Sequence, residues 1–167
     1  MASARAHHAH VDGEIMDIYD VHFPSMKDMP LPEYLQAITK AMLEAPNRIP
    51  PEAYEEILGR HCSTDFKVTA GRPETNLIAS NLEQHTRNLK AFIAANPDYH
   101  IEVQNTTIQL DDRTGRAVIF CTTRVSGLFG AHGVRQSVNQ VRARRRQDEH
   151  WVAYELASLR GPGHLTF

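Results

Sequence analysis

The stretch that decides the fold runs from Asn81 to Asp111 and reads NLEQHTRNLKAFIAANPDYHIEVQNTTIQLD. Before Pro97 its apolar residues recur at helical spacing, and after Pro97 they recur at every second position. Because proline cannot continue a helix, the sequence predicts that a helix over residues 74–95 ends there and a strand begins. One side of that helix carries Ile78, Leu82, His85, Leu89 and Phe92. Four of these side chains belong in a core, and the fifth is a histidine.

Downstream of this stretch the period of two continues to the end of the chain. It predicts strands over residues 99–111, 116–129, 132–146 and 150–161. The segments that join them, DDRTG, GLFGAHG and RQDEH, are short and turn-like. The second half of the chain is therefore predicted to form a four-stranded antiparallel meander.

Upstream, helical periodicity dominates. Apolar spacing and prolines predict helices over residues 30–46 and 51–62, and STDFKVTA, residues 63–70, predicts a strand before the third helix. Helices first and strands last favour an α+β fold with three helices covering one face of a curved, mostly antiparallel sheet. We expect one domain over residues 29–162, preceded by a flexible arm (1–28) and followed by a short tail (163–167).

Composition narrows the possible partners and the cellular location. The chain has 167 residues and a net charge of −2, which gives no reason to expect nucleic acid or a membrane as a partner. Cys62 and Cys121 lie far apart without metal-ligand spacing, so neither a disulfide framework nor a zinc site is predicted, and a reducing compartment is expected. No apolar run is long enough to span a membrane, and the expected location is cytoplasmic. His8 and Asp12 bound an HxHxD pattern, which we attribute to the arm and not to a metal site.

His85 has two interpretations that the sequence leaves open. A histidine on an apolar helix face is either a structural residue with a hydrogen-bond partner or the polar group of a binding cavity. If it lines a cavity, the ordinary pKa of histidine suits it to move a proton. Asp65, at the start of the strand 63–70, is likewise either a turn residue or a carboxylate that orients the histidine or acts as a base.

The meander contributes further polar candidates. In VRQSVNQVRAR the face with Ser137 and Asn139 is expected to point inward, which makes Asn139 a candidate donor to a carbonyl or oxyanion. Arg124 either binds an anionic or carbonyl group or pairs with Glu155, because the inward face of its strand is ambiguous. Glu155 lies in a nearly apolar strand, where a carboxylate needs a partner or has a raised pKa.

Together, HCSTDFKV, the stretch from NLEQHTRNLKAF to DYHIEV and the last three strands resemble the SnoaL-like branch of the nuclear transport factor 2-like superfamily, of the small fungal secondary-metabolism type. The resemblance covers roughly residues 30–162. It implies a cone-shaped α+β barrel, a homodimer formed through the outer sheet face, and a pocket for small apolar ligands that works without a cofactor. His85 and Asp65 lie where similar sequences have a histidine and an acidic residue, but Leu156 replaces a histidine that is frequent in the last strand.

The hypothesis that follows is a cofactor-independent isomerase, cyclase or dehydratase acting on a polyketide- or terpenoid-like intermediate. Its acid–base residues are His85 with Asp65 or Glu155, and Asn139 and Arg124 polarise a carbonyl. The apolar walls of the pocket are assigned to Tyr54, Phe66, Leu89, Phe120 and Trp151. The alternatives are a non-catalytic module that binds a ligand or partner, and a purely structural dimer with a filled cone.

Overall fold

The computed structural model describes residues 29–47, 51–70, 77–130 and 133–159. The predicted N-terminal arm, with its HxHxD pattern, and the C-terminal tail lie outside the described residues. The helices are α1 (Leu31–Glu44), the short 3-10 helix η1 (Ala45–Asn47), α2 (Pro51–His61) and α3 (Leu82–Ala95). The strands are β1 (Cys62–Ala70), β2 (His100–Asp111), β3 (Arg116–Ser126), β4 (Arg135–Arg145) and β5 (Trp151–Leu159).

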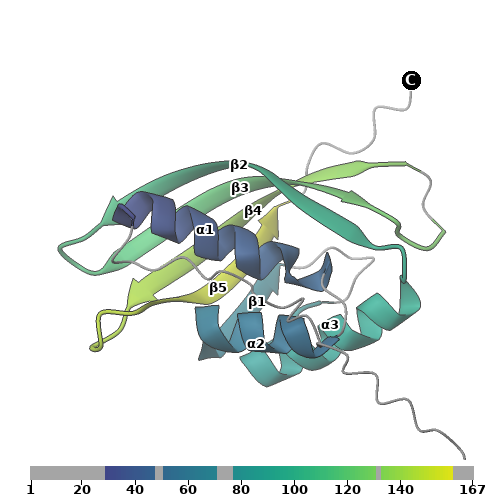
Figure 1. Cartoon of the computed structure of the whole chain (residues 1–167), viewed down its shortest axis with the longest axis horizontal. Helices are drawn as coiled ribbons and strands as arrows, with labels where there is room; N and C mark the ends of the chain where they lie inside the picture. The colour runs from purple at the N-terminus through teal and green to yellow at the C-terminus, as the bar shows by residue number, and fades with distance from the viewer. Residues whose placement is uncertain (1–28, 48–50, 71–76, 131–132, 160–167) are drawn as a thin grey trace, which may run out of the picture.

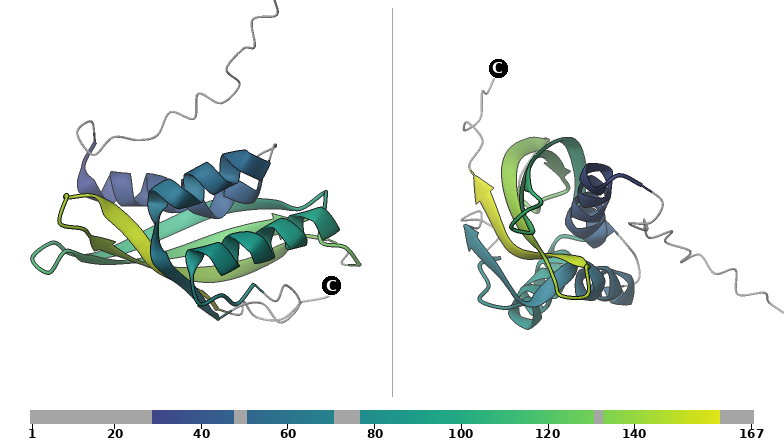
Figure 2. Two further views of the ribbon diagram at one scale, coloured as in Figure 1. Left: turned by 90° about the horizontal axis from the view of Figure 1, so that it is seen from below. Right: turned by 90° about the vertical axis from the view of Figure 1, so that its left-hand side faces the viewer.

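The five strands form one sheet in the order β1-β5-β4-β3-β2 (Figure 1). Strands β2 to β5 form the predicted antiparallel meander, and β1 is added in parallel beside β5. The sheet curves around α1, while α2 and α3 lie beneath its β1–β5 side (Figure 2). The predicted α+β fold, with three helices on a curved, mostly antiparallel sheet, is confirmed.

The hydrophobic core lies between this concave face and the helices. Alternation decides which side chains enter it, because successive residues of a strand point to opposite faces. On β3 the inward residues include Ile119, Cys121 and Val125, and on β4 they include Val141 and Ala143. Helix α1 supplies Leu35, Ile38 and Met42 at helical spacing.

Helix α3 starts later than the sequence predicts. Its N-cap is Asn81, whose side chain accepts a hydrogen bond from the backbone N–H of Gln84 at 2.8 Å. Just upstream, Ala79 forms a β-bridge with Val68, so this segment is extended and not helical. Ile78 is consequently 57% exposed, and its predicted place on the buried side of the helix is wrong.

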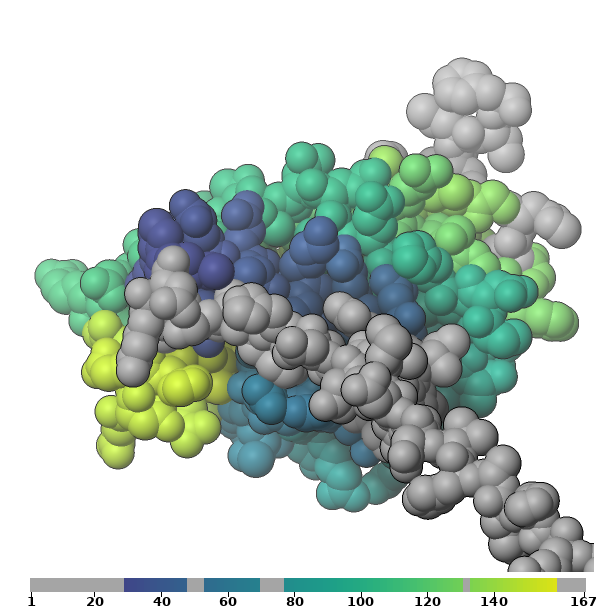
Figure 3. All heavy atoms as spheres, in the orientation of Figure 1, coloured from purple at the N-terminus to yellow at the C-terminus, as the bar shows by residue number. Residues whose placement is uncertain are grey.

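The free edge of β2 is covered by the end of α1 and by η1. The Asn47 side chain pairs with the backbone of Ile101 in both directions, donating to its carbonyl oxygen at 2.7 Å and accepting from its N–H at 2.9 Å. The Glu44 carboxylate accepts a hydrogen bond from the N–H of Val103 at 2.9 Å. These contacts satisfy backbone groups that an edge strand leaves unpaired. In Figure 3 the side chains of α1, in purple and blue, lie directly against the green strands.

Strand β5 contains a bulge that changes which of its residues face inward. Arg142 of β4 is paired with Glu155 and the next residue, Ala143, with Ala153, which leaves Tyr154 as an extra residue. Tyr154 and Glu155 therefore both lie on the outer face, where the guanidinium of Arg144 stacks over the Tyr154 ring at 5.3 Å. Plain strand alternation would send these two neighbours to opposite faces, and the bulge is the reason that it does not.

Candidate active site

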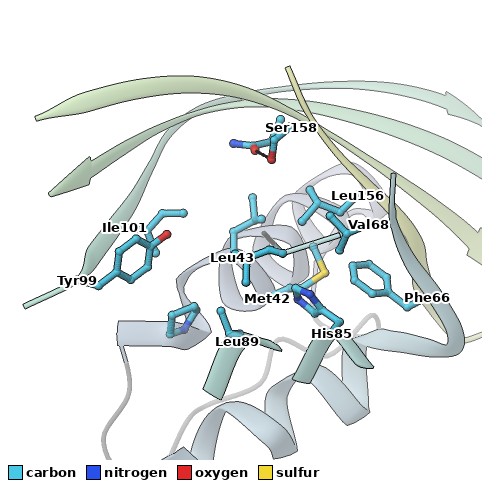
Figure 4. Close-up of a pocket in the computed structure, with 13 residues that line it drawn as sticks. Met42, Leu43, Phe66, Val68, His85, Leu89, Tyr99, Ile101, Leu156 and Ser158 are labelled. Atoms are coloured by element: carbon cyan, nitrogen blue, oxygen red, sulfur yellow. Dashed lines mark hydrogen bonds between the residues drawn. The ribbon is translucent and has the colours of Figure 1, made fainter. Parts of the chain in front are cut away.

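A cavity of about 80 Å³ lies between the sheet, α1 and α3. It is several times the roughly 10–15 Å³ that one water molecule needs, so it has room for a small organic molecule. Figure 4 shows α1 residues between the sheet above and α3 below. The apolar walls include Met42, Leu43, Phe66, Leu89, Ile101 and Leu156.

His85 reaches this cavity from the first half of α3. His85 is only 6% exposed, and the centroid of its ring lies 5.3 Å from the centroid of the Phe66 ring. Nδ1 is buried without a hydrogen-bond partner among the described residues. Burial lowers the pKa of His85 to about 4, because an imidazolium loses its hydration there, so the ring is neutral at pH 7.

On the sheet side, Asn139 is the central member of a buried polar network. Its Nδ2 donates to Thr123 Oγ1 at 2.8 Å, and its Oδ1 accepts from Ser158 Oγ at 2.8 Å. Thr123 is joined in turn to Ser137 by a hydroxyl–hydroxyl bond of 2.9 Å. Asn139 and Ser158 line the cavity, and Figure 4 shows Ser158 under the strands, across the cavity from His85. The network fixes the amide of Asn139 in one orientation.

Tyr99 lines the end of the cavity that is formed by the start of β2. Its ring packs edge-on against Phe92 of α3, with centroids 4.9 Å apart. In Figure 4 its phenol oxygen points toward the interior of the cavity. The segment NPDY marks the end of a helix and is part of the resemblance, but nothing in the sequence assigned Tyr99 to the cavity.

Asp65 does not lie at the cavity. Strand alternation sends Phe66 and Val68 inward and Asp65 outward, where Arg144 donates to its carboxylate at 2.7 Å. A hydrogen bond from Ser63 and the pairing with Arg144 hold the pKa of Asp65 below its ordinary value. The expected contact between Asp65 and His85 is therefore not made.

Glu155, Arg124 and Phe120 also lie on the outer face of the sheet. Glu155 has 14% of its side chain exposed and pairs with Lys67 at 3.5 Å and Arg142 at 3.9 Å, not with Arg124. Arg124 is exposed and Phe120 half-buried, because Ile119, Cys121, Thr123 and Val125 occupy the inward positions of β3. The sequence left the face of this strand ambiguous, and the structure decides it against these two residues.

The four assigned wall residues other than Phe120 divide into two groups. Phe66 and Leu89 line the cavity. Tyr54 and Trp151 lie in the core, where each is 1% exposed, but they do not line the cavity. The cavity is also lined by residues that were not predicted from the sequence: Met42, Leu43, Pro46, Val68, Leu77, Tyr99, Ile101, Leu156 and Ser158. Met42 was recognisable from the apolar face of α1, whereas Leu156 and Ser158 depend on the β5 bulge.

This arrangement suits neutral chemistry. The described residues that line the cavity include no carboxylate, lysine or arginine. Within the described ranges no cluster of three histidine, cysteine, aspartate or glutamate residues is close enough to hold a metal ion. The cavity therefore offers a neutral imidazole on α3 and a fixed amide donor on β4.

No helix among the described residues is long and apolar enough to cross a membrane.

Comparison with known proteins gives likeness in structure alone. No protein-family model and no curated protein matches the sequence. A proposed ketosteroid isomerase from Shewanella frigidimarina superposes with a TM-score of 0.58 at 11% identity, covering 73% of this chain and 91% of that chain. The association domain of C. elegans CaMKII gives a TM-score of 0.56 at 16% identity, covering 81% of this chain and 100% of that one.

A third similar structure belongs to a protein whose fold is described as cystatin-like. An NTF2-like protein with a cystatin-like fold from Novosphingobium aromaticivorans has a TM-score of 0.55 at 18% identity, over 77% of this chain and 79% of that chain. At these identities the likeness shows the arrangement of elements and not the activity. The chain therefore has a cystatin-like fold, the fold described for this NTF2-like protein.

Proposed function

We propose that the cavity binds a small, largely apolar carbonyl compound and that His85 moves a proton on it. The protein would be a cofactor-independent isomerase, cyclase or dehydratase of the SnoaL-like type, acting on a polyketide- or terpenoid-like intermediate of secondary metabolism. The observation that supports this most is that His85 lines the cavity while its buried Nδ1 has no hydrogen-bond partner among the described residues. A structural histidine in a core normally has its ring nitrogens hydrogen-bonded.

The depressed pKa of His85 limits the chemistry that it performs. A base with a pKa of about 4 takes a proton from carbon only if the resulting imidazolium is stabilised. An enolate supplies that stabilisation: the C–H bond breaks, its electron pair passes to the carbonyl oxygen, and the proton goes to His85. The new ion pair is neutral overall, and a low-dielectric cavity strengthens the attraction.

Asn139 would stabilise the negative charge that develops on the carbonyl oxygen of the substrate. Its amide nitrogen has two N–H groups, and only one is used in the bond to Thr123. The second can donate to an enolate oxygen, as donors in oxyanion holes do. Return of the proton from His85 to another carbon completes an isomerisation, and attack of the enolate on a second carbonyl completes a cyclisation.

The experiment is exchange of α-hydrogens in D₂O. Small cyclic ketones and 1,3-diketones are incubated with the protein, and loss of the α-proton signals is followed by NMR. We expect exchange that depends on the protein and is lost in His85→Gln, which keeps a neutral polar side chain. Exchange at the uncatalysed rate for every compound in the panel would contradict a proton-transfer function.

The second candidate is a non-catalytic module that carries a small ligand. It is favoured by one observation: no described carboxylate lines the cavity to support His85 as a base. In that case the ketones bind and His85→Gln still binds them, but neither protein exchanges their hydrogens. Binding and exchange measured on the same samples separate the two functions.

We also propose that two copies associate through the outer face of the sheet. Half-buried apolar side chains of neighbouring strands, Val118, Phe120 and Val138, are clustered there, flanked by the ion pair of Arg142 and Glu155. The likeness to an association domain is consistent with this use of the fold. Light scattering should give a dimer mass, and Phe120→Glu should give a monomer that remains folded. A monomeric wild type would contradict the proposal.

A further inference from the structure

The polar wall of the cavity has hydrogen-bonding groups that the protein itself leaves unused. Asn139 is 4% exposed and donates to Thr123 and accepts from Ser158, which leaves one amide N–H without an acceptor among the described residues. A buried N–H without an acceptor is costly, so a ligand that supplies one gains affinity.

Ser158 differs from Asn139 in what it can offer. Its only hydroxyl hydrogen is donated to Asn139 Oδ1 at 2.8 Å. Toward the cavity Oγ therefore presents lone pairs alone, and it can accept a hydrogen bond but not give one. The ligand atom that lies against Ser158 must then be a donor, such as a hydroxyl group.

The two requirements apply at neighbouring points in space. Ser158 Oγ is hydrogen-bonded to the amide oxygen of Asn139. The donor and the acceptor of the ligand must therefore lie only a few covalent bonds apart. We propose that the ligand is a hydroxy-carbonyl compound, with a hydroxyl one or two carbons from a C=O group. The enol form of a 1,3-dicarbonyl meets the same requirement. This inference rests on the proposed function. It assigns Ser158 as the residue that recognises the ligand hydroxyl by accepting its hydrogen bond.

The same wall discriminates against carboxylates. A carboxylate offers acceptors alone, and it would place its lone pairs against those of Ser158. No lysine or arginine is among the described residues that line the cavity, so its charge would stay uncompensated. A hydroxy-carbonyl ligand instead brings a matching donor and acceptor without a charge.

The test uses three probes of similar size: cyclohexanone, 2-hydroxycyclohexanone and cyclohexanecarboxylate. Dissociation constants are measured by NMR titration of the ¹⁵N-labelled full chain, including the side-chain NH₂ signals of Asn139. For the wild type we expect the hydroxyketone to bind about fivefold to tenfold more tightly than the ketone, the effect of one added hydrogen bond. The carboxylate should bind most weakly.

A matched pair of variants isolates the hydroxyl of Ser158. Ser158→Thr and Ser158→Val add the same bulk, but only threonine keeps the hydroxyl. The preference for the hydroxyketone over the ketone should persist in Ser158→Thr and disappear in Ser158→Val. Because each ratio is taken within one variant, a general change in cavity size cancels, and binding of cyclohexanone shows that the variant is folded.

The outcomes separate this inference from the function on which it rests. If the ketone binds but the hydroxyketone gains nothing, or if Ser158→Val keeps the full preference, the assignment of Ser158 is overturned and the proposed function stands. If cyclohexanone exchanges its α-hydrogens normally while the carboxylate binds best, the ligand class is likewise overturned. If no probe shifts any cavity signal, both proposals fail.

Discussion

His85 and Asn139 line one cavity from opposite sides, His85 from helix α3 and Asn139 from the middle of strand β4. Neither side chain carries a charge at neutral pH, since burial lowers the pKa of His85 to about 4. Asn139 is fixed by hydrogen bonds on both sides of its amide, whereas the buried Nδ1 of His85 has no partner among the described residues. A buried ring nitrogen without a partner costs stability, and this cost motivates the proposal that the cavity holds a ligand.

Replacing His85 by phenylalanine should separate function from stability. Phenylalanine keeps the ring contact with Phe66 and removes the buried nitrogen that lacks a partner. We expect the free energy of unfolding to stay constant or to rise by about 1 kcal/mol, while α-hydrogen exchange is lost. Urea denaturation checks the first part. A loss of several kcal/mol would show that His85 is a structural residue.

Stability should fall with acid in a window that two buried histidines define. His85 and His61 each have a pKa of about 4 in the fold, against 6.5 when unfolded, through burial and, for His61, also through Arg60 and His150. A lowered folded pKa means that the unfolded chain binds protons more readily, so stability is full above pH 6.5 and declines toward pH 4. Each histidine contributes about 3 kcal/mol to this decline.

The control for the acid window is the same phenylalanine variant. With His85 gone, the slope of unfolding free energy against pH between 6.5 and 4 should be about half that of the wild type. Asp65, whose pKa is lowered by Ser63 and Arg144, loses its contribution only at lower pH. A wild-type stability that is flat across this window would contradict the buried, neutral state of both histidines.

Asp65→Asn should have little effect of any kind. The Asp65–Arg144 pair lies on the outer face with side chains 61% and 42% exposed, and pairs of this sort contribute about 0–1 kcal/mol. Exchange of α-hydrogens should stay within about twofold of the wild type, because Asp65 does not line the cavity. A large loss of exchange in this variant would restore the carboxylate to the mechanism.

Gly127→Ala should destabilise the protein beside the cavity. Gly127 has a φ of +72°, and an added Cβ would overlap the backbone carbonyl of Asp98. Left-handed backbone alone costs a residue with a side chain about 1–2 kcal/mol, and the overlap forces the two loops apart. Gly59→Ala is the matched control: it lies in α2 with no atom near the added Cβ and should stabilise by about 0.5–1 kcal/mol. Thermal unfolding of the two variants should shift in opposite directions.

Periodicity predicted most of the fold because the core is built on it. The change at Pro97, the four-stranded meander and the inward face of β4 with Asn139 all follow from the spacing of apolar residues. The late start of α3 does not, because the bridge between Ala79 and Val68 is a tertiary contact that overrides local helical spacing.

The site was harder to predict because it depends on the direction of single side chains. Both faces of β3 are partly apolar, so Phe120 and Arg124 could not be placed from alternation. One extra residue at the β5 bulge put Glu155 outside and Leu156 and Ser158 inside. Asp65 was suggested by its position at the start of a strand and by the resemblance, and neither of these specifies the face of the sheet on which it lies.

The most direct test of the central claim is the rate of α-hydrogen exchange in two variants measured side by side on the same cyclic ketone in D₂O. His85→Gln changes the cavity, and Asp65→Asn changes the outer face. If His85 moves the proton, His85→Gln lowers the catalysed rate about 10²-fold or more, the usual contribution of a general base, and Asp65→Asn leaves it unchanged. Equal rates in the two variants would show that His85 is not the base.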